Sequence, residues 1–184
     1  MRAKLSSLLQ QSSLFFQDLT RSEPALSVSG KFVKGINFGG EALTIQGNRW
    51  ESEQSALQAG LMLPAAQQLQ TNLLPQPYAS QPMRQMLNTL VYRPQKLELT
   101  QILPNGSYQL YLWLIENYQS DWHALELRLN DSPVAQNLGK LPLGHWACYG
   151  GYAVTLSDGQ LRLSLSAHRP DVDAHLMGLS IFRV

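Results

Sequence analysis

The amino-acid sequence predicts an all-β fold, an antiparallel β-sandwich, from three observations. Turn residues such as Asn105-Gly106 and Asp158-Gly159 separate short apolar runs. From residue 86 onward no long helical pattern intervenes. Apolar residues also recur at every second position, as expected for strands with one buried face, in the segments 97–99, 108–114, 123–129, 152–156 and 161–165. Closely spaced strands joined by short turns are typical of two packed antiparallel sheets.

Length and charge exclude several classes of function. The 184 residues fit one domain with a well-filled core. Lys and Arg number 14 against 13 Asp and Glu, so the net charge of +1 creates no field that attracts nucleic acid or an anionic membrane. Polar residues interrupt every apolar stretch well before the roughly 20 residues that span a bilayer. We expect a soluble protein that binds neither nucleic acid nor membrane.

Residues 1–27 form a predicted N-terminal helical extension, and residues 28–184 the β-sandwich domain. Leucines and phenylalanines between residues 5 and 19 recur at nearly helical spacing, and Pro24 follows. This short helix either packs on the domain or binds a partner protein. The polar run Gln10–Ser13 and the absence of a nearby small-residue cleavage site disfavour a secretory signal, so we expect a cytoplasmic protein.

The remaining elements follow in order along the chain. The segment "LSVSGKFVKGINFGG" predicts a strand that ends in a turn at Gly39-Gly40. Residues 51–83, rich in Gln, Ala, Leu and Pro, predict an irregular excursion with short helical turns over one end of the sheet. The segment 130–133 predicts a turn, and the run 174–184 predicts the closing strand.

Catalysis is not predicted, because the sequence contains no G-x-S-x-G, Walker or H-E-x-x-H motif. The close acidic pairs Glu51/Glu53 and Asp171/Asp173 do not reveal the carboxylate separation of roughly 5 to 9.5 Å that glycosidases use. We expect no cofactor and no metal, since metal-ligand spacing is lacking among the four histidines, His123, His145, His168 and His175. The single Cys148, beside Trp146 and Tyr149, is interpreted as a packed thiol.

Aromatic residues beside polar ones favour sugar recognition. Trp50, Tyr118, Trp122 and Trp146 fall at predicted loops or strand ends, next to amides, carboxylates and an arginine. Aromatic faces stack on the C–H faces of a pyranose, while amides and carboxylates receive its hydroxyl groups. The alternative for Trp122 and Trp146 is that they seal the ends of the sandwich.

Six segments in order resemble the malectin and malectin-like family of carbohydrate-binding domains, over residues 28 to 184. "LPNGSYQLYLWLIENY" is similar to the family's most specific motif, P-N-G-x-Y-x-V-x-L-x-F-A-E-x-Y. The other segments are "INFGG", "GNRWESE", "LNTLVYR", "LSDGQLRLSL" and "DAHLMGLSIF". The resemblance implies a jelly-roll-like sandwich of the galactose-binding-domain-like type, with a shallow oligosaccharide site formed by loops at one end.

The resemblance also implies roles for individual residues. Trp50 and Tyr118 match aromatic stacking platforms of the family. Asp173 matches the acidic residue before the last strand, with Asp171 as the alternative. Glu116 matches the F-A-E glutamate, for which a structural role is expected.

Departures from the family pattern concern the same site. Leu87 replaces an aromatic residue, and Gln119 follows Tyr118 where a second aromatic stands in the family. Asn88 keeps the polar part of the Q-T-E-R segment, and Trp122 compensates for lost aromatic surface. The predicted site for an oligosaccharide or polysaccharide therefore comprises Trp50, Asn88, Tyr118, Gln119, Trp122 and Asp173.

A second hypothesis keeps the fold without the sugar site. The N-terminal helix and the segment 51–83 would then bind another protein. An exposed apolar patch larger than a few hundred Å² on that segment would favour this function.

Overall fold

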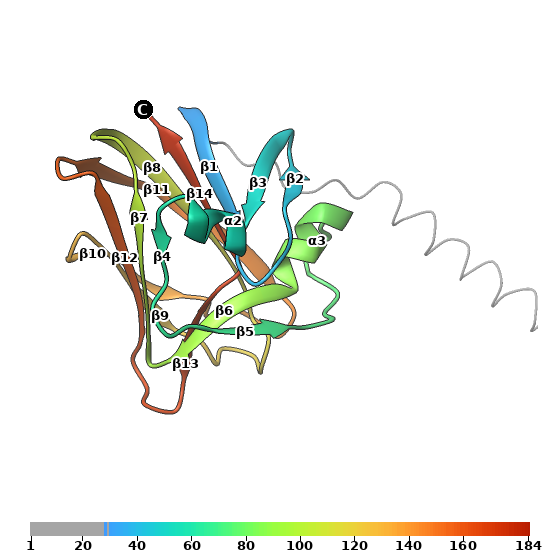
Figure 1. Cartoon of the computed structure of the whole chain (residues 1–184). Helices are drawn as coiled ribbons and strands as arrows, with labels where there is room; N and C mark the ends of the chain where they lie inside the picture. The colour runs from blue at the N-terminus through green and yellow to red at the C-terminus, as the bar shows by residue number, and fades with distance from the viewer. Residues whose placement is uncertain (1–27, 29) are drawn as a thin grey trace, which may run out of the picture.

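The computed structural model describes residue 28 and residues 30–184. The predicted N-terminal helix therefore lies outside the described residues. Within them, strands account for most of the ordered backbone and the two helices are short (Figure 1). The predicted antiparallel β-sandwich is confirmed. Neither of the helices in these residues is long and apolar enough to cross a membrane.

The six-stranded sheet forms one layer of the sandwich. Its pairings are antiparallel except for the parallel contact between β1 and β3. Across the sheet, the order is β11 (Trp146–Leu156), β8 (Gly106–Ile115), β14 (Gly178–Arg183), β1 (Lys31–Asn37), β3 (Asn48–Ser52) and β2 (Leu43–Ile45).

The five-stranded sheet forms the other layer, and a three-stranded sheet lies at one end. The five strands run β10 (Ser132–Leu138), β9 (Leu125–Leu129), β12 (Gln160–Ala167), β7 (Lys96–Ile102) and β4 (Leu61–Met62). The three run β13 (Asp173–Leu176), β6 (Thr89–Pro94) and β5 (Gln67–Gln70). The two helices are α2 (Glu53–Gln58) and α3 (Gln81–Leu87).

Strand β8 lies at the centre of the core. Leu110, Leu112 and Leu114 are fully buried, as the predicted alternation requires. The opposite face of β8 is buried too, because Tyr111 packs edge-on against Phe182 at 5.6 Å and Trp113 against Trp50 at 5.0 Å, measured between ring centroids. Buried leucines on β7, β9 and β12 alternate with partly exposed polar residues, so one face of that sheet meets the core.

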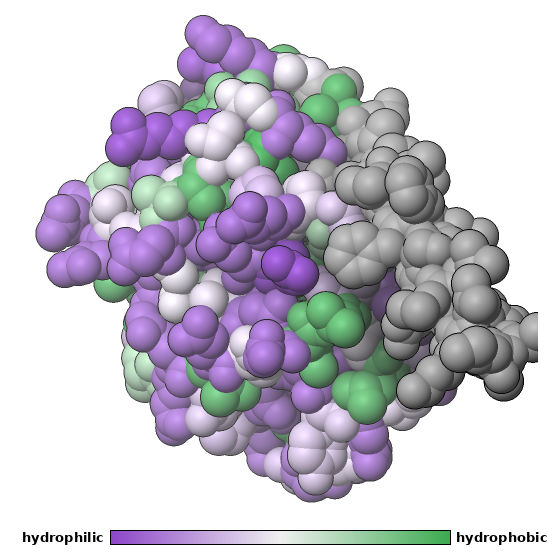
Figure 2. All heavy atoms as spheres, turned by 90° about the vertical axis from the view of Figure 1, so that its right-hand side faces the viewer, coloured by the Kyte–Doolittle hydropathy of each residue, from purple (hydrophilic) through white to green (hydrophobic). Residues whose placement is uncertain are grey.

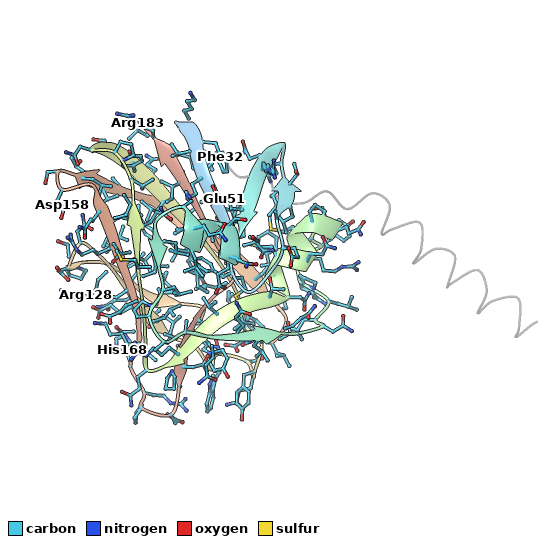
Figure 3. All side chains as sticks on the ribbon, in the orientation of Figure 1. Phe32, Glu51, Arg128, Asp158, His168 and Arg183 are labelled. Carbon is cyan, nitrogen blue, oxygen red and sulfur yellow. The ribbon has the colours of Figure 1, made fainter. Side chains whose placement is uncertain are left out.

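Several element boundaries differ from the sequence prediction. The excursion 51–83 contains the short strands β4 and β5 besides the expected helical turns. The predicted turn at 130–133 is shorter than expected, because β10 begins at Ser132 and pairs with β9. His123 lies before β9 and not within it. Figure 3 shows His168, in the connection from β12 to β13, at the end of the molecule opposite Phe32 and Arg183.

Candidate functional site

The loop that follows β8 is organised by one buried carboxylate. Glu116 has no exposed surface. Its carboxylate accepts hydrogen bonds from the backbone N–H of Tyr118 at 3.1 Å, from the backbone N–H of His123 at 3.0 Å, and from Nδ1 of His123 at 2.9 Å. Since the donors come from both ends of the segment 117–123, Glu116 holds this loop closed. These contacts lie within the protein, in keeping with the expected structural role.

A second set of hydrogen bonds ties the loop to the segment that precedes β11. The backbone N–H of Asp121 donates to the carbonyl of Leu141 at 2.8 Å, and the N–H of Leu143 donates to the Ser120 hydroxyl at 3.0 Å. The N–H of Gly144 donates to the carbonyl of Glu116 at 2.8 Å. The loop backbone is therefore fixed on two sides, which also fixes the Cα positions from which its aromatic side chains project.

Two aromatic side chains of this loop meet at the surface. Tyr118 is 65% exposed, and its ring centroid lies 4.8 Å from that of the half-buried Trp122. The guanidinium carbon of Arg169 lies 4.3 Å from the centroid of the Trp122 ring, so it covers one face of that ring. Arg169 in turn pairs with Asp171. We call Tyr118, Gln119, Trp122 and Arg169 the aromatic surface.

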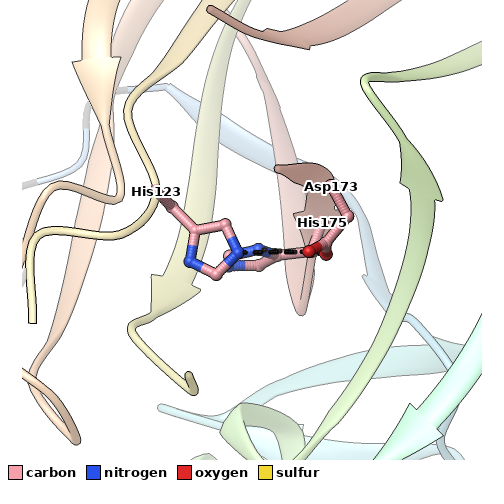
Figure 4. Close-up of side chains that lie close together, drawn as sticks. All are labelled: His123, Asp173 and His175. Carbon is pink, nitrogen blue, oxygen red and sulfur yellow. Dashed lines mark ion pairs between the residues drawn. The ribbon is translucent and has the colours of Figure 1, made fainter. Parts of the chain in front are cut away.

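Two histidines and an aspartate converge next to the aromatic surface (Figure 4). Nε2 of His123 lies 3.5 Å from Oδ1 of Asp173, and Nδ1 of His175 lies 4.0 Å from Oδ2 of Asp173. The rings of His123 and His175 meet edge-on, with centroids 4.1 Å apart. Asp173 and His175 come from β13, where residues two apart point to the same side of the strand.

The charges in this cluster shift one another's pKa values. Burial lowers the pKa of His123, but the nearby carboxylates of Asp173 and Glu116 outweigh it and raise the pKa above the ordinary value. Burial raises the pKa values of Glu116 and Asp173, yet their contacts with His123 hold both below the usual range. Burial also holds the pKa of His175 far below its ordinary value, so this ring is neutral at pH 7.

Trp50 does not belong to the site, which corrects the sequence prediction. It lies in β3 and is 2% exposed. A Cβ atom placed on Gly35 would come within 2.5 Å of the Trp50 ring, and one on Gly178 within 3.0 Å. The ring therefore packs directly on the backbones of β1 and β14. No sugar ring can reach a side chain enclosed in this way, so the prediction of Trp50 as a stacking platform is wrong.

Asn88 is also used inside the protein. Its side-chain oxygen accepts hydrogen bonds from Thr71 Oγ1 at 2.8 Å and from the backbone N–H of Leu73 at 2.6 Å. Its amide nitrogen donates to the carbonyls of Arg84 and Leu73 at 2.9 and 3.1 Å. Because both ends of this buried amide are satisfied, Asn88 fixes the chain around the end of α3. Its predicted role in binding a sugar hydroxyl is not supported by these contacts.

Asn88 lines a cleft whose described walls contain none of the aromatic-surface residues. The cleft encloses about 680 Å³ between the turn after β1, the segment 70–74 and α3. No aromatic side chain is among the described residues that line it. The structure thus brings Tyr118, Gln119, Trp122 and Asp173 to one region and places Trp50 and Asn88 elsewhere.

Trp146 fits the alternative that the sequence left open. It is 6% exposed, and its indole N–H donates to the carbonyl of Pro77 at 2.7 Å. A buried indole with its single donor satisfied is a packing residue. The structure therefore leaves Tyr118 and Trp122 as the aromatic residues of the predicted site that ligands can reach.

Comparison with solved structures shows the same fold in other proteins. A β-glucuronidase from Bacteroides uniformis is 12% identical with a TM-score of 0.68, over 82% of this chain and 18% of that one. The ANX1 ectodomain from Arabidopsis thaliana is 17% identical with a TM-score of 0.63, over 83% of this chain and 48% of that one. The plant receptor-like kinase FER is 13% identical with a TM-score of 0.64, over 82% of this chain and 42% of that one.

These likenesses concern the fold alone, because so few residues are identical. The chain spans less than half the length of each of these proteins. No family model matches the chain, and neither does any curated protein. The resemblance to malectin-like domains noted in the sequence is thus supported at the level of the fold.

Proposed function

We propose that this protein is a non-catalytic module that binds an oligosaccharide or polysaccharide on its aromatic surface. One observation carries the proposal. Tyr118, 65% exposed, lies directly after a buried strand, with its ring 4.8 Å from that of Trp122. Exposed aromatic pairs held by a rigid loop are suited to stack on the apolar face of a pyranose.

The rigidity of the loop supports the proposal on energetic grounds. When a flexible loop becomes ordered on ligand binding, the lost conformational entropy weakens the affinity. Here the bonds of Glu116 and the ties to Leu141 and Leu143 already fix the loop. The loop backbone therefore loses little further freedom when a ligand binds.

Polar groups beside the aromatic rings supply hydrogen bonds. Asp173 retains 35% side-chain exposure despite its contact with His123, and the Gln119 side chain is exposed. These groups accept from and donate to sugar hydroxyls. Since Arg169 covers one face of Trp122, Tyr118 is the principal platform. Such a shallow site binds a small sugar weakly, at about micromolar Kd or above.

The contacts of Glu116 support a non-catalytic function. A glycosidase needs two carboxyl groups that reach opposite sides of the scissile bond. Glu116 is fully buried and accepts three N–H groups of its own loop, so it cannot face a substrate across from Asp173. The same fold within a β-glucuronidase is compatible with a binding module attached to a carbohydrate-active enzyme.

A glycan-array screen tests the proposal. The wild type is expected to bind glycans of one linkage class, and Tyr118→Ala to lose that signal. Tyr78→Ala is the matched control, because Tyr78 is 38% exposed and lies outside the aromatic surface. Folded wild-type protein that binds no glycan, or binding that survives Tyr118→Ala, would contradict the proposal.

Exposed apolar side chains favour a second candidate, a protein-interaction module on the same fold. Leu74 is 77% exposed, and four further apolar residues of the segment 51–83 are exposed: Leu57, Met62, Leu69 and Tyr78. On the face seen in Figure 2, however, hydrophilic groups predominate and the apolar groups among them are small. Pull-downs with the full chain and with Leu74→Asp distinguish this candidate, since a partner seated here would be lost from the variant.

A further inference from the structure

His123, Asp173 and His175 offer three potential metal ligands at one point. One ligand atom of each lies within 4.8 Å of those of the other two. His123 comes from the loop after β8, while Asp173 and His175 come from β13 (Figure 4). We propose that these three side chains bind one divalent transition-metal ion of the Zn²⁺ class, a function distinct from sugar binding although both sites use Asp173.

The first support is that buried ring nitrogens lack hydrogen-bond partners. Nε2 of His123 and both ring nitrogens of His175 are enclosed without one. Asp173 lies 3.5 Å from Nε2 of His123, which is too long for a strong hydrogen bond. The carbonyl of Ile115 lies near the His175 ring, but no hydrogen bond of normal geometry forms there. Buried polar atoms rarely remain unsatisfied, and coordination would satisfy one nitrogen on each ring.

The second support is the orientation of His123. Glu116 accepts from Nδ1 of this ring at 2.9 Å, so the proton of the neutral ring resides on Nδ1. When this ring is neutral, the lone pair of Nε2 therefore points toward the carboxylate of Asp173, and a proton or a metal ion between the two atoms removes the repulsion of two acceptors 3.5 Å apart. A carboxylate behind a histidine is a common arrangement at metal sites, where it fixes the ring and increases its basicity.

The ligand set and the distances select the metal. Two imidazole nitrogens and one carboxylate suit Zn²⁺ and its neighbours, whereas Ca²⁺ and Mg²⁺ prefer oxygen ligands alone. Ligand atoms of a tetrahedral zinc site lie about 3.3 Å apart. The ligand atoms lie within 4.8 Å of one another, with contacts of 3.5 and 4.0 Å to the two oxygens of Asp173, so the site must contract by up to about 1.5 Å to hold the ion.

The site is also accessible. The two histidines are at most 1% exposed, whereas the Asp173 side chain is 35% exposed. An ion therefore enters past Asp173, and the fourth coordination position is left to water.

Calorimetric titration of the untagged full chain with ZnCl₂, after treatment with a chelator, tests the proposal. We expect one ion per chain with a micromolar or tighter Kd. At zinc concentrations about a hundredfold above Kd, the melting temperature should rise by about 5 to 10 °C. Co²⁺ should give the intense visible absorption of a tetrahedral complex.

Matched variants locate the site. Asp173→Asn and His123→Gln should each weaken zinc binding at least tenfold. Asp171→Asn and His168→Gln should leave the Kd unchanged, because Asp171 and His168 are exposed residues outside the cluster. Asp173 is only partly buried, so its variant should remain folded. A folded wild type that binds no zinc, or an Asp173→Asn variant that retains the wild-type Kd, would overturn the proposal. Neither result depends on glycan binding.

Discussion

At the scale of single residues, Trp50 lies in the core and not in a binding site. Its ring fills the space against the backbones of Gly35 and Gly178 and packs edge-on against Trp113. Trp50→Ala should lower the free energy of unfolding by about 3 to 5 kcal/mol, because it removes a large buried ring and leaves a cavity. Urea denaturation measures this loss. Trp122→Ala serves as the comparison and should lower the free energy of unfolding by less. An unchanged urea midpoint for Trp50→Ala would refute the placement of Trp50 in the core.

The sequence contained a signal for the burial of Trp50. The residues Gln46 and Gly47 both have positive φ, of 48° and 78°, as in a two-residue hairpin turn. Trp50 and Ser52 then alternate inward along β3. The polar neighbours Arg49 and Glu51, which favoured a loop, are the outward-facing residues of that strand.

Cys148 is a second residue whose environment decides its chemistry. Burial raises the pKa of its thiol to about 12. At pH 8 almost none of this thiol is then ionised, and the thiolate is the reactive form. Iodoacetamide should therefore label native protein far more slowly than urea-unfolded protein. Equal labelling rates would show that the thiol is not held in a packed environment.

At the scale of elements, strand β8 belongs to the core and leads directly into the loop of the candidate site. Its leucines face the interior, and its end leads into Glu116. Leu112→Ala should lower the free energy of unfolding by about 2 to 5 kcal/mol, since Leu112 is fully buried. A denaturation midpoint equal to that of the wild type would mean that the inward face of β8 is assigned wrongly.

The loop after β8 depends on Glu116. Glu116→Ala would leave the His123 ring and two backbone N–H groups without their acceptor, at a cost of about 3 to 5 kcal/mol. The near-ultraviolet circular dichroism of Tyr118 and Trp122 should change as well, because their loop loses its anchor. Glu116→Gln keeps an oxygen acceptor and should lose less stability. An alanine variant as stable as the wild type would show that the loop is held by other contacts.

At the scale of the whole molecule, the sheets could be predicted where burial alternates along the strand. This holds for β7, β9 and β12, whose leucines face one side. The prediction fails for β5, which is exposed throughout, and for β10, whose exposed residues show no alternation. Such edge strands form through backbone pairing to their neighbours, which leaves little trace in side-chain pattern.

The candidate site was predictable only where it is local in sequence. Tyr118, Gln119 and Trp122 belong to one loop, and the resemblance supplied Asp173. The pairing of His123 with His175 comes from topology, since β13 is separated in sequence from the loop after β8. No spacing rule for metal ligands covers residues brought together in this way. The burial of Asn88 likewise depends on its contacts with the segment 71–73.

Sugar binding at Tyr118 is the central claim, and calorimetry with the best glycan from the array tests it most directly. The Kd of Tyr118→Ala should rise by about tenfold or more, since a central aromatic platform contributes much of the binding energy. Its melting temperature should stay close to that of the wild type, because the Tyr118 ring is 65% exposed. A variant that binds the glycan with the wild-type Kd would contradict the account and move the binding site away from the aromatic surface.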